Sequence, residues 1–102
     1  MRDINQNEFK EAVQEGFTLV DVYGDNCGPC VMLAAILEVL EKENPFVNIV
    51  KINADKNKEL ADELDIQGVP TLLFMKDGEE QERKLGAISI DEIMETAGAY
   101  LY

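Results

Sequence analysis

The sequence is poor in positive charge. It has 9 lysines and arginines against 21 aspartates and glutamates, which gives a formal net charge of −12. Nucleic acids and anionic membranes would be repelled by such a chain, so neither is an expected partner. The acidity has two interpretations that the sequence does not separate. It keeps a small protein in solution, or it steers the chain toward partners with basic docking faces.

The sequence also has no histidine, no tryptophan and only two cysteines. Two cysteines without a histidine fall short of the four ligands of a zinc or iron–sulfur site, so no metal is expected unless two chains share their cysteines. No apolar run reaches about 18 residues, so no membrane span is predicted. The N-terminus, Met1 to Asn5, lacks an apolar signal region, and we therefore expect a cytoplasmic protein.

The rest of the composition is typical of a folded chain. Hydrophobic residues make up 46% and charged residues 29% of the sequence, which is globular rather than disordered. A chain of 102 residues is long enough for one modest core. We therefore expect residues 1–102 to form a single domain.

The two cysteines lie in one motif, Cys27-Gly28-Pro29-Cys30. It follows a short β-prone segment and precedes an almost continuously apolar one, so it marks the junction of a strand and a helix. Residues one helical turn apart have Cα atoms roughly 5–6 Å apart, which a disulfide accepts. The closed ring is too short to restrain much unfolded-chain entropy. The motif predicts reversible thiol–disulfide chemistry, with a structural disulfide or an inert thiol pair as the alternative.

Capping residues mark the expected helices. Asn5 with Glu8, and Ser89 with Glu92, each fit a capping box flanked by a hydrophobic staple. Asn57 is the expected cap of a shorter helix. The predicted helices cover, in chain order, residues 5–16, a segment that begins at about Cys27 and continues through the apolar residues 31–40, residues 57–64 and residues 89–101.

Strands are predicted between these helices. Residues 17–23, 47–53 and 71–75 are apolar and β-prone. Asp77-Gly78 is a two-residue hairpin signal that leads to a charged strand at residues 79–85, which is typical of a sheet edge. With a short strand at the N-terminus, the early alternation predicts parallel pairing and the hairpin adds an antiparallel edge. The expected fold class is α/β.

Four motifs occur in a definite order along the chain: Val20-Asp21-Val22-Tyr23 before the two cysteines, Gly68-Val69-Pro70-Thr71, Asp77-Gly78, and Lys84-Leu85-Gly86-Ala87. Together they resemble the thioredoxin family over essentially the whole chain. The resemblance implies a thioredoxin fold, with a central mixed sheet of about five strands flanked by four helices. It also implies a protein-disulfide reductase.

Cys27 is the candidate nucleophile. It is expected at or just before a helix N-terminus, where unpaired N–H groups and the helix dipole favour a thiolate. It would attack a substrate disulfide, and Cys30, one turn into the helix, would then resolve the mixed disulfide. Gly28 leaves the nucleophile uncovered, and Pro29 fits the first helical turn because it lacks an N–H. The redox-active Cys27–Cys30 disulfide requires no cofactor.

Asp21 is the second catalytic candidate. It interrupts an apolar strand, and an isolated buried carboxylate is costly, so its pKa should be raised. A raised pKa would let Asp21 take a proton from Cys30 when that thiol attacks. By resemblance, Asp21 matches the family's buried aspartate and Lys51 the lysine near it, which would tune Asp21. The alternatives are an outward-facing Asp21 and a Lys51 with its amine in water.

The segment around Pro70 is the expected substrate platform. The resemblance implies a cis Val69–Pro70 bond that holds the backbone of Val69 and Thr71 beside the cysteines. An extended substrate segment would pair there with Val69. The alternative is a proline that merely begins a strand. The expected substrate-binding residues are Asn26, Gly28, Pro29, Val69, Pro70, Thr71 and Gly86.

The chain departs from the family pattern near the cysteines. Asn26 stands where a tryptophan normally precedes the first cysteine, Val31 where a basic residue is common, and Ala35 where the family has a helix-kinking proline. Gly24 and Asp25 are expected to make the approach loop more flexible and more acidic. These changes leave the dithiol chemistry intact, but they leave open which reductase recharges the protein.

The implied partners are protein disulfides and a flavoprotein thioredoxin reductase, either ordinary or atypical, and we expect a monomer. Three functions stay open from the sequence. The first is a general dithiol electron carrier, the second is a dedicated donor to one enzyme such as a peroxidase or another reductase, and the third is a non-catalytic binding module.

Overall fold

The computed structural model describes residues 1–101. In this part of the chain one five-stranded mixed sheet has the strand order β1-β3-β2-β4-β5. The strands β1, β3 and β2 are parallel, whereas β4 runs antiparallel to β2 and to β5. The elements in chain order are β1 (Arg2–Ile4), α1 (Phe9–Val13), β2 (Phe17–Tyr23), α2 (Gly28–Glu43), β3 (Asn48–Asn53), α3 (Lys58–Glu63), β4 (Thr71–Lys76), β5 (Glu79–Leu85) and α4 (Ile90–Ala97).

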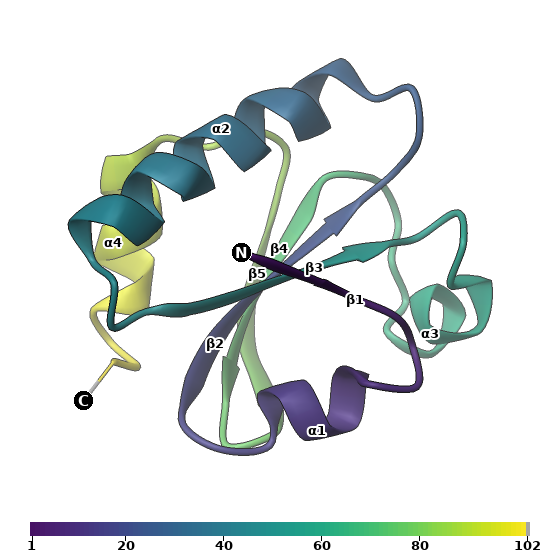
Figure 1. Cartoon of the computed structure of the whole chain (residues 1–102), viewed down its shortest axis with the longest axis horizontal. Coiled ribbons are helices and arrows are strands. Elements are labelled where there is room, and N and C mark those ends of the chain that lie inside the picture. Colours follow the sequence, from purple (N-terminus) through teal and green to yellow (C-terminus); the bar gives the residue numbers. More distant parts are fainter. Residues whose placement is uncertain (102) are drawn as a thin grey trace.

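Helices cover both faces of this sheet. Figure 1 shows α2 and α4 on one side, with α1 and α3 on the other. Because strand side chains alternate between faces, Val20 and Val22 of β2 join α1 and α3 in one core cluster. Leu19 of β2 instead packs with α2 and α4 in a second cluster. The predicted mixed sheet flanked by four helices is confirmed, and so is the placement of residues 79–85 at an edge.

The predicted capping boxes form only in part. The Ser89 hydroxyl accepts from the Glu92 N–H at 3.1 Å, but the Glu92 carboxylate lies 3.7 Å from the Lys84 amine, with which it pairs. At the other site the Glu8 carboxylate accepts from the Asn5 N–H at 3.0 Å. The first residues after Asn5 form a turn, however, and α1 itself begins only at Phe9.

α3 lies where it was predicted, with Asn57 as its N-cap residue. The Asn57 side chain does not cap the helix, because its amide oxygen accepts from the Gln6 N–H at 2.8 Å and so joins the two loops. The last helix ends at Ala97, and Leu101 packs on the core from the segment that follows. A tertiary contact overrides the local signal at Asn57, whereas α4 ends at Gly98, its C-cap residue. α2 begins directly after Cys27, as predicted, so its first turn carries the cysteine motif, and it continues to Glu43, beyond the apolar segment 31–40.

Candidate active site

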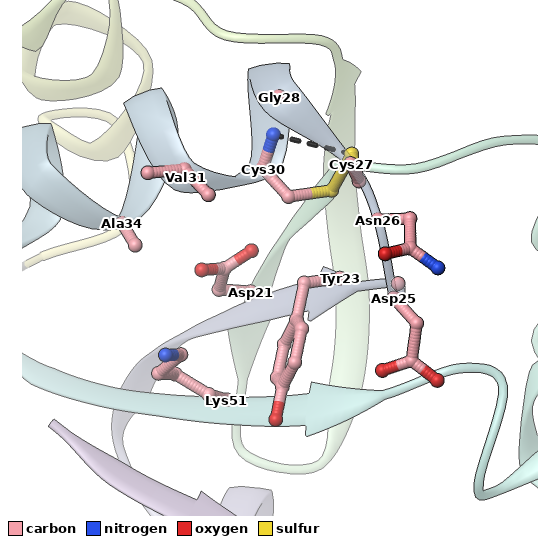
Figure 2. A pocket seen from close by; sticks show the side chains of 11 residues that line it. Asp21, Tyr23, Asp25, Asn26, Cys27, Gly28, Cys30, Val31, Ala34 and Lys51 are labelled. Carbon is pink, nitrogen blue, oxygen red and sulfur yellow. Dashed lines mark hydrogen bonds between the residues drawn. A yellow bond between two sulfur atoms is a disulfide. The ribbon is translucent and has the colours of Figure 1, made fainter.

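The two cysteines form a disulfide at the start of α2. Cys27 is the N-cap residue, and its Cα lies 5.2 Å from that of Cys30. The Cys30 N–H donates to the Cys27 sulfur at 3.2 Å, as Figure 2 shows. Cys27 is half-buried, whereas Cys30 is buried against the sheet. An N-cap position with a backbone donor favours a thiolate on Cys27 once the disulfide is reduced.

The two residues between the cysteines keep the sulfur accessible. Gly28 and Pro29 are exposed and occupy the first turn of α2. A Cβ placed on Gly28 would meet no heavy atom within 4 Å, so packing does not require glycine there. Pro29 sits where a missing N–H does no harm.

The proline loop lies directly beside Cys27. The Val69–Pro70 peptide bond is cis, and the Val69 carbonyl oxygen is 3.9 Å from the Cys27 sulfur. Val69 is exposed and Pro70 is buried. Thr71 is also buried, and its hydroxyl donates to the Gly68 carbonyl at 2.6 Å, so its side chain supports the loop and does not face a substrate.

Gly86 connects the end of β5 to this loop. Its N–H donates to the Pro70 carbonyl at 2.8 Å. Its φ of 91° lies in the left-handed region that favours glycine. The structure therefore brings together Cys27, Val69, Pro70 and Gly86, which are far apart in the sequence.

Asp21 lies on the sheet face below α2, in a row of charged residues. In the strand register Asp21 of β2 pairs with Lys51 of β3, and Lys51 pairs in turn with Asp3 of β1. Figure 2 shows Asp21 beneath the first turn of α2, with Lys51 on the neighbouring strand. The Lys51 amine lies 4.8 Å from the centre of the Tyr23 ring. Tyr23 donates its hydroxyl to Asp3 at 2.7 Å.

The environment of Asp21 opposes its ionisation. The side chain is fully buried, and neither carboxylate oxygen has a hydrogen-bond partner among the described residues. Burial raises the pKa of the Asp21 carboxyl from 3.8 to about 6; Lys51 offsets part of this effect, and Asp3 adds to it. The alternative of an outward-facing Asp21 is wrong. Lys51 is half-buried and lies opposite Asp21 in the register of β2 and β3. Its positive charge therefore lowers the pKa of Asp21.

A cavity of about 480 Å³ connects these groups. Its lining includes Asp21, Lys51, Cys27 and Cys30, and it opens to solvent. The Asp21 carboxylate oxygens are themselves buried away from solvent, so the carboxyl lies in the inner wall of this cavity, beneath the first turn of α2 (Figure 2).

The loop before Cys27 is held by a polar network that our sequence analysis missed. The Asp55 carboxylate accepts from the Asp25 N–H at 2.7 Å, and the Asn53 amide donates to the Asp25 carboxylate at 3.0 Å. A Cβ on Gly24 would lie 3.0 Å from a Val69 methyl carbon, so close packing explains this glycine. Asn26 is exposed and has a left-handed φ of 51°. These hydrogen bonds hold the loop in one conformation, in contrast to the flexibility expected from the sequence.

The signal for this network was present in the strand order. β2 and β3 are parallel neighbours, so the residues after their carboxyl ends meet at one edge of the sheet. Asp25 follows β2, and Asp55 follows β3. Short polar residues after two buried parallel strands were the available clue.

The fold and site define a class of protein before any comparison is made. A disulfide at a helix N-cap, half-exposed on one sulfur and buried on the other, above a buried carboxyl, is the arrangement of a dithiol–disulfide oxidoreductase. Within residues 1–101, no group of three or more His, Cys, Asp or Glu residues is placed to hold a metal ion. None of the helices in the same residues has the length and apolarity to cross a membrane.

The comparisons with known proteins agree with this class. The thioredoxin family model matches residues 1–99. The chain is 37% identical over 94 residues to thioredoxin from Bacillus subtilis, covering 91% of this chain and 90% of that one. It is 36% identical over 91 residues to thioredoxin from Chlamydia muridarum, covering 89% of each. A solved structure of a mutant thioredoxin from Halobacterium salinarum superposes with a TM-score of 0.90 at 31% identity, covering 99% of this chain and 90% of that one.

The chain belongs to the thioredoxin family, and it has the thioredoxin fold. The family and the Cys27–Cys30 disulfide support a protein-disulfide oxidoreductase activity. The expected general activity is thereby confirmed.

Proposed function

We propose that this chain is a single-domain electron carrier that reduces protein disulfides through Cys27. The observation that carries the proposal is the Cys27 sulfur at the N-cap of α2, 3.9 Å from the Val69 carbonyl. In the reduced form, the Cys27 thiolate attacks a substrate disulfide and expels one substrate thiolate. Cys30 then attacks Cys27 in the mixed disulfide, releases the second substrate thiolate and re-forms the internal disulfide. Two electrons pass to the substrate in each cycle.

The neighbouring residues take distinct parts in this cycle. Asp21, which lines the same cavity as Cys30, accepts the Cys30 proton, and Lys51 limits how far burial raises the pKa of that carboxyl. Val69 offers its backbone to an extended substrate segment. Asn26, Gly28, Pro29 and Gly86 form the rest of the contact surface, with Pro70 and Thr71 supporting the loop beneath it.

The return of electrons requires a partner. A flavoprotein thioredoxin reductase would supply two electrons to the Cys27–Cys30 disulfide, so the chain itself carries no cofactor. We place this cycle in the cytoplasm, where thiols are kept reduced. The protein acts as a monomer, and its acidity argues against nucleic-acid and membrane partners.

The proposal is tested by insulin reduction with dithiothreitol as the electron source. The chain should accelerate the precipitation of insulin well above the rate with dithiothreitol alone. A sample in which both cysteines were alkylated before the assay is the matched control. A wild-type rate equal to that control would contradict the proposal.

Asn26 favours a specialised reductase over a common one, and this supports a second candidate, a donor tied to particular partners. An aromatic ring before the nucleophile offers the rigid apolar contact that dominates interface energies, whereas Asn26 offers little. We expect turnover with an NADPH-dependent reductase from an unrelated source about tenfold below that of the Bacillus subtilis relative, which corresponds to about 1.4 kcal/mol. Asn26→Trp should recover part of this difference. Steady-state rates at equal protein concentration measure it.

The left-handed backbone at Asn26 requires a control. A bulky side chain is strained at a φ of 51°, so Asn26→Trp should lower the melting temperature slightly. Asn26→Gly keeps that backbone and adds no apolar area, so it should not gain turnover. If the wild type already matches the relative and tryptophan adds nothing, the specialised-partner idea fails while the dithiol mechanism stands.

A further inference from the structure

α2 is apolar on its outer face as well as on its inner one. Its inner face carries Cys30, Leu33, Leu37 and Leu40, all buried. On the opposite side Val31 is 71%, Met32 60% and Val39 50% exposed, and Ala35 between them is exposed as well. These four residues recur at helical spacing and form one stripe, here termed the outer α2 stripe. Glu38 and Lys42 are exposed beside the stripe, so it is an apolar patch with a charged border, and such exposed patches mark interaction sites.

No element of the described chain covers the stripe. α2 lies at the periphery of the molecule in Figure 1, with the sheet beneath it and α4 alongside. The stripe begins at Val31, which also lines the cavity beside the disulfide. It is therefore continuous with the surface on which the thiol–disulfide exchange takes place.

Its size and setting decide what kind of partner fits. Four side chains are far fewer than the roughly 20–30 residues per partner of a stable interface, whereas redox encounters are among the smallest known. A second copy would bring another net charge of −12 against the first, so self-association is opposed. A transient partner with an apolar patch and a basic rim is favoured on both counts.

We propose that the outer α2 stripe docks the protein that donates electrons to the Cys27–Cys30 disulfide, through an apolar surface with a basic rim. The inference rests on the proposed function. The same donor must meet this chain in every cycle, while substrates differ, so a fixed contact away from the sulfurs serves the donor. Asn26 adds little apolar area beside Cys27, and the exposed Val69 and Leu85 lie at the proline loop that serves substrates, so the outer α2 stripe is left for the donor.

The electron transfer itself balances. A donor thiolate attacks the Cys27 sulfur and breaks the Cys27–Cys30 bond, and the Cys30 thiolate that leaves takes a proton. The donor's second thiolate then attacks the donor sulfur that is bonded to Cys27. This forms the donor disulfide and releases the Cys27 thiolate. The donor loses two electrons, and this chain gains them.

The test is Val39→Lys, assayed with the flavoprotein purified from the source cells by its ability to reduce this disulfide. Val39 lies about 14 Å along the helix axis from Cys30, so the sulfurs are undisturbed. We expect the KM of the flavoprotein for this chain to rise about fivefold with kcat unchanged, since only docking is lost. Val39→Glu should raise KM less, because it keeps the attraction to a basic rim. Ala35→Lys, which suits a helix, is the second variant.

The matched control is Phe46→Lys, which makes the same charge change at another exposed apolar residue, 67% exposed and beyond the C-terminal end of α2. It should leave KM unchanged. An equal rise of KM in Phe46→Lys and Val39→Lys would show that the added charge, and not its place in the stripe, weakens docking, and it would overturn the proposal. So would an unchanged KM in Val39→Lys, an equal loss of insulin reduction with dithiothreitol, or a wild-type dimer that Val39→Lys dissociates. If wild-type insulin reduction itself fails, it is the proposed function that fails.

Discussion

Replacing Cys27 with serine is expected to abolish insulin reduction, leaving only the rate of dithiothreitol alone. The half-exposed Cys27 sulfur is the one that a substrate can reach, whereas Cys30 is 4% exposed. A serine hydroxyl is not ionised near neutral pH and does not form the mixed disulfide. Cys30→Ser should also stop turnover, but by a different route. It keeps the nucleophile and lacks the resolving thiol, so stable mixed disulfides should accumulate and appear on non-reducing gels.

The same roles predict unequal alkylation of the reduced wild-type protein. Cys27 accepts the Cys30 N–H and lies at the helix N-cap, so its thiolate fraction and access both exceed those of Cys30. Iodoacetamide followed by peptide mass spectrometry should show Cys27 modified much earlier. Equal rates, or earlier modification of Cys30, would reverse the assigned roles. The two serine variants provide the matched rates for each thiol alone.

The sequence predicts most of the fold because its signals are local. The strand at residues 17–23 and the hairpin at Asp77-Gly78 are determined by neighbouring residues, and both occur as expected. Asn57 is the N-cap residue of α3 as predicted, but its side chain accepts from the Gln6 N–H, which is distant in the sequence and adjacent only in the folded chain. The last helix ends at Ala97, earlier than predicted, but Leu101 keeps helical spacing from Ala97, to whose carbonyl its N–H donates at 3.0 Å, and it packs on the core as expected.

The site shows the same division between local and distant information. Cys27 and Cys30 are recognisable because their spacing alone determines their chemistry. Asp21 is recognisable because one carboxylate interrupts an apolar strand. The Asp25–Asn53–Asp55 network requires the strand order, since β2 and β3 must be known to be parallel neighbours. The outer α2 stripe requires the knowledge of which face of the helix meets the sheet, which an apolar sequence on both faces does not reveal.

Asp21→Asn is expected to stabilise the oxidised protein at neutral pH and to remove a specific pH dependence. Folding raises the pKa of Asp21 from 3.8 to about 6, so the folded state binds more protons than the unfolded state between these values. Stability contributed by the protonated form is therefore fully present below pH 4 and is lost as the pH rises through about 6. The shift corresponds to about 3 kcal/mol at pH 7. The asparagine of the Asp21→Asn variant does not ionise, so burial destabilises no charged form of it.

Urea unfolding at several pH values measures this effect. The wild type should lose stability between pH 4 and 6.5 relative to Asp21→Asn, with the difference constant above that range. Asp62→Asn is the matched control, because it removes an exposed carboxylate from α3 and should follow the wild type. Parallel curves for wild type and Asp21→Asn would show that Asp21 ionises as easily in the folded state as in the unfolded one.

The same substitution should slow turnover, although it stabilises the protein. The asparagine side chain of the Asp21→Asn variant accepts no proton, so Cys30 must lose its proton to solvent before it attacks the mixed disulfide. Positioned general bases commonly contribute about 10²–10⁴-fold, and solvent that reaches Cys30 through the neighbouring cavity replaces part of that contribution here. We expect at least a tenfold lower rate of resolution at pH 7 in single-turnover reduction of a peptide disulfide. The deficit should shrink toward pH 9, because the rising hydroxide concentration removes the Cys30 proton without a general base. A deficit that is the same at every pH would instead indicate a structural effect of Asp21 on the position of Cys30. If Asp21→Asn raises the free energy of unfolding and lowers the rate of resolution over the same pH range, the buried carboxyl serves proton transfer and not stability.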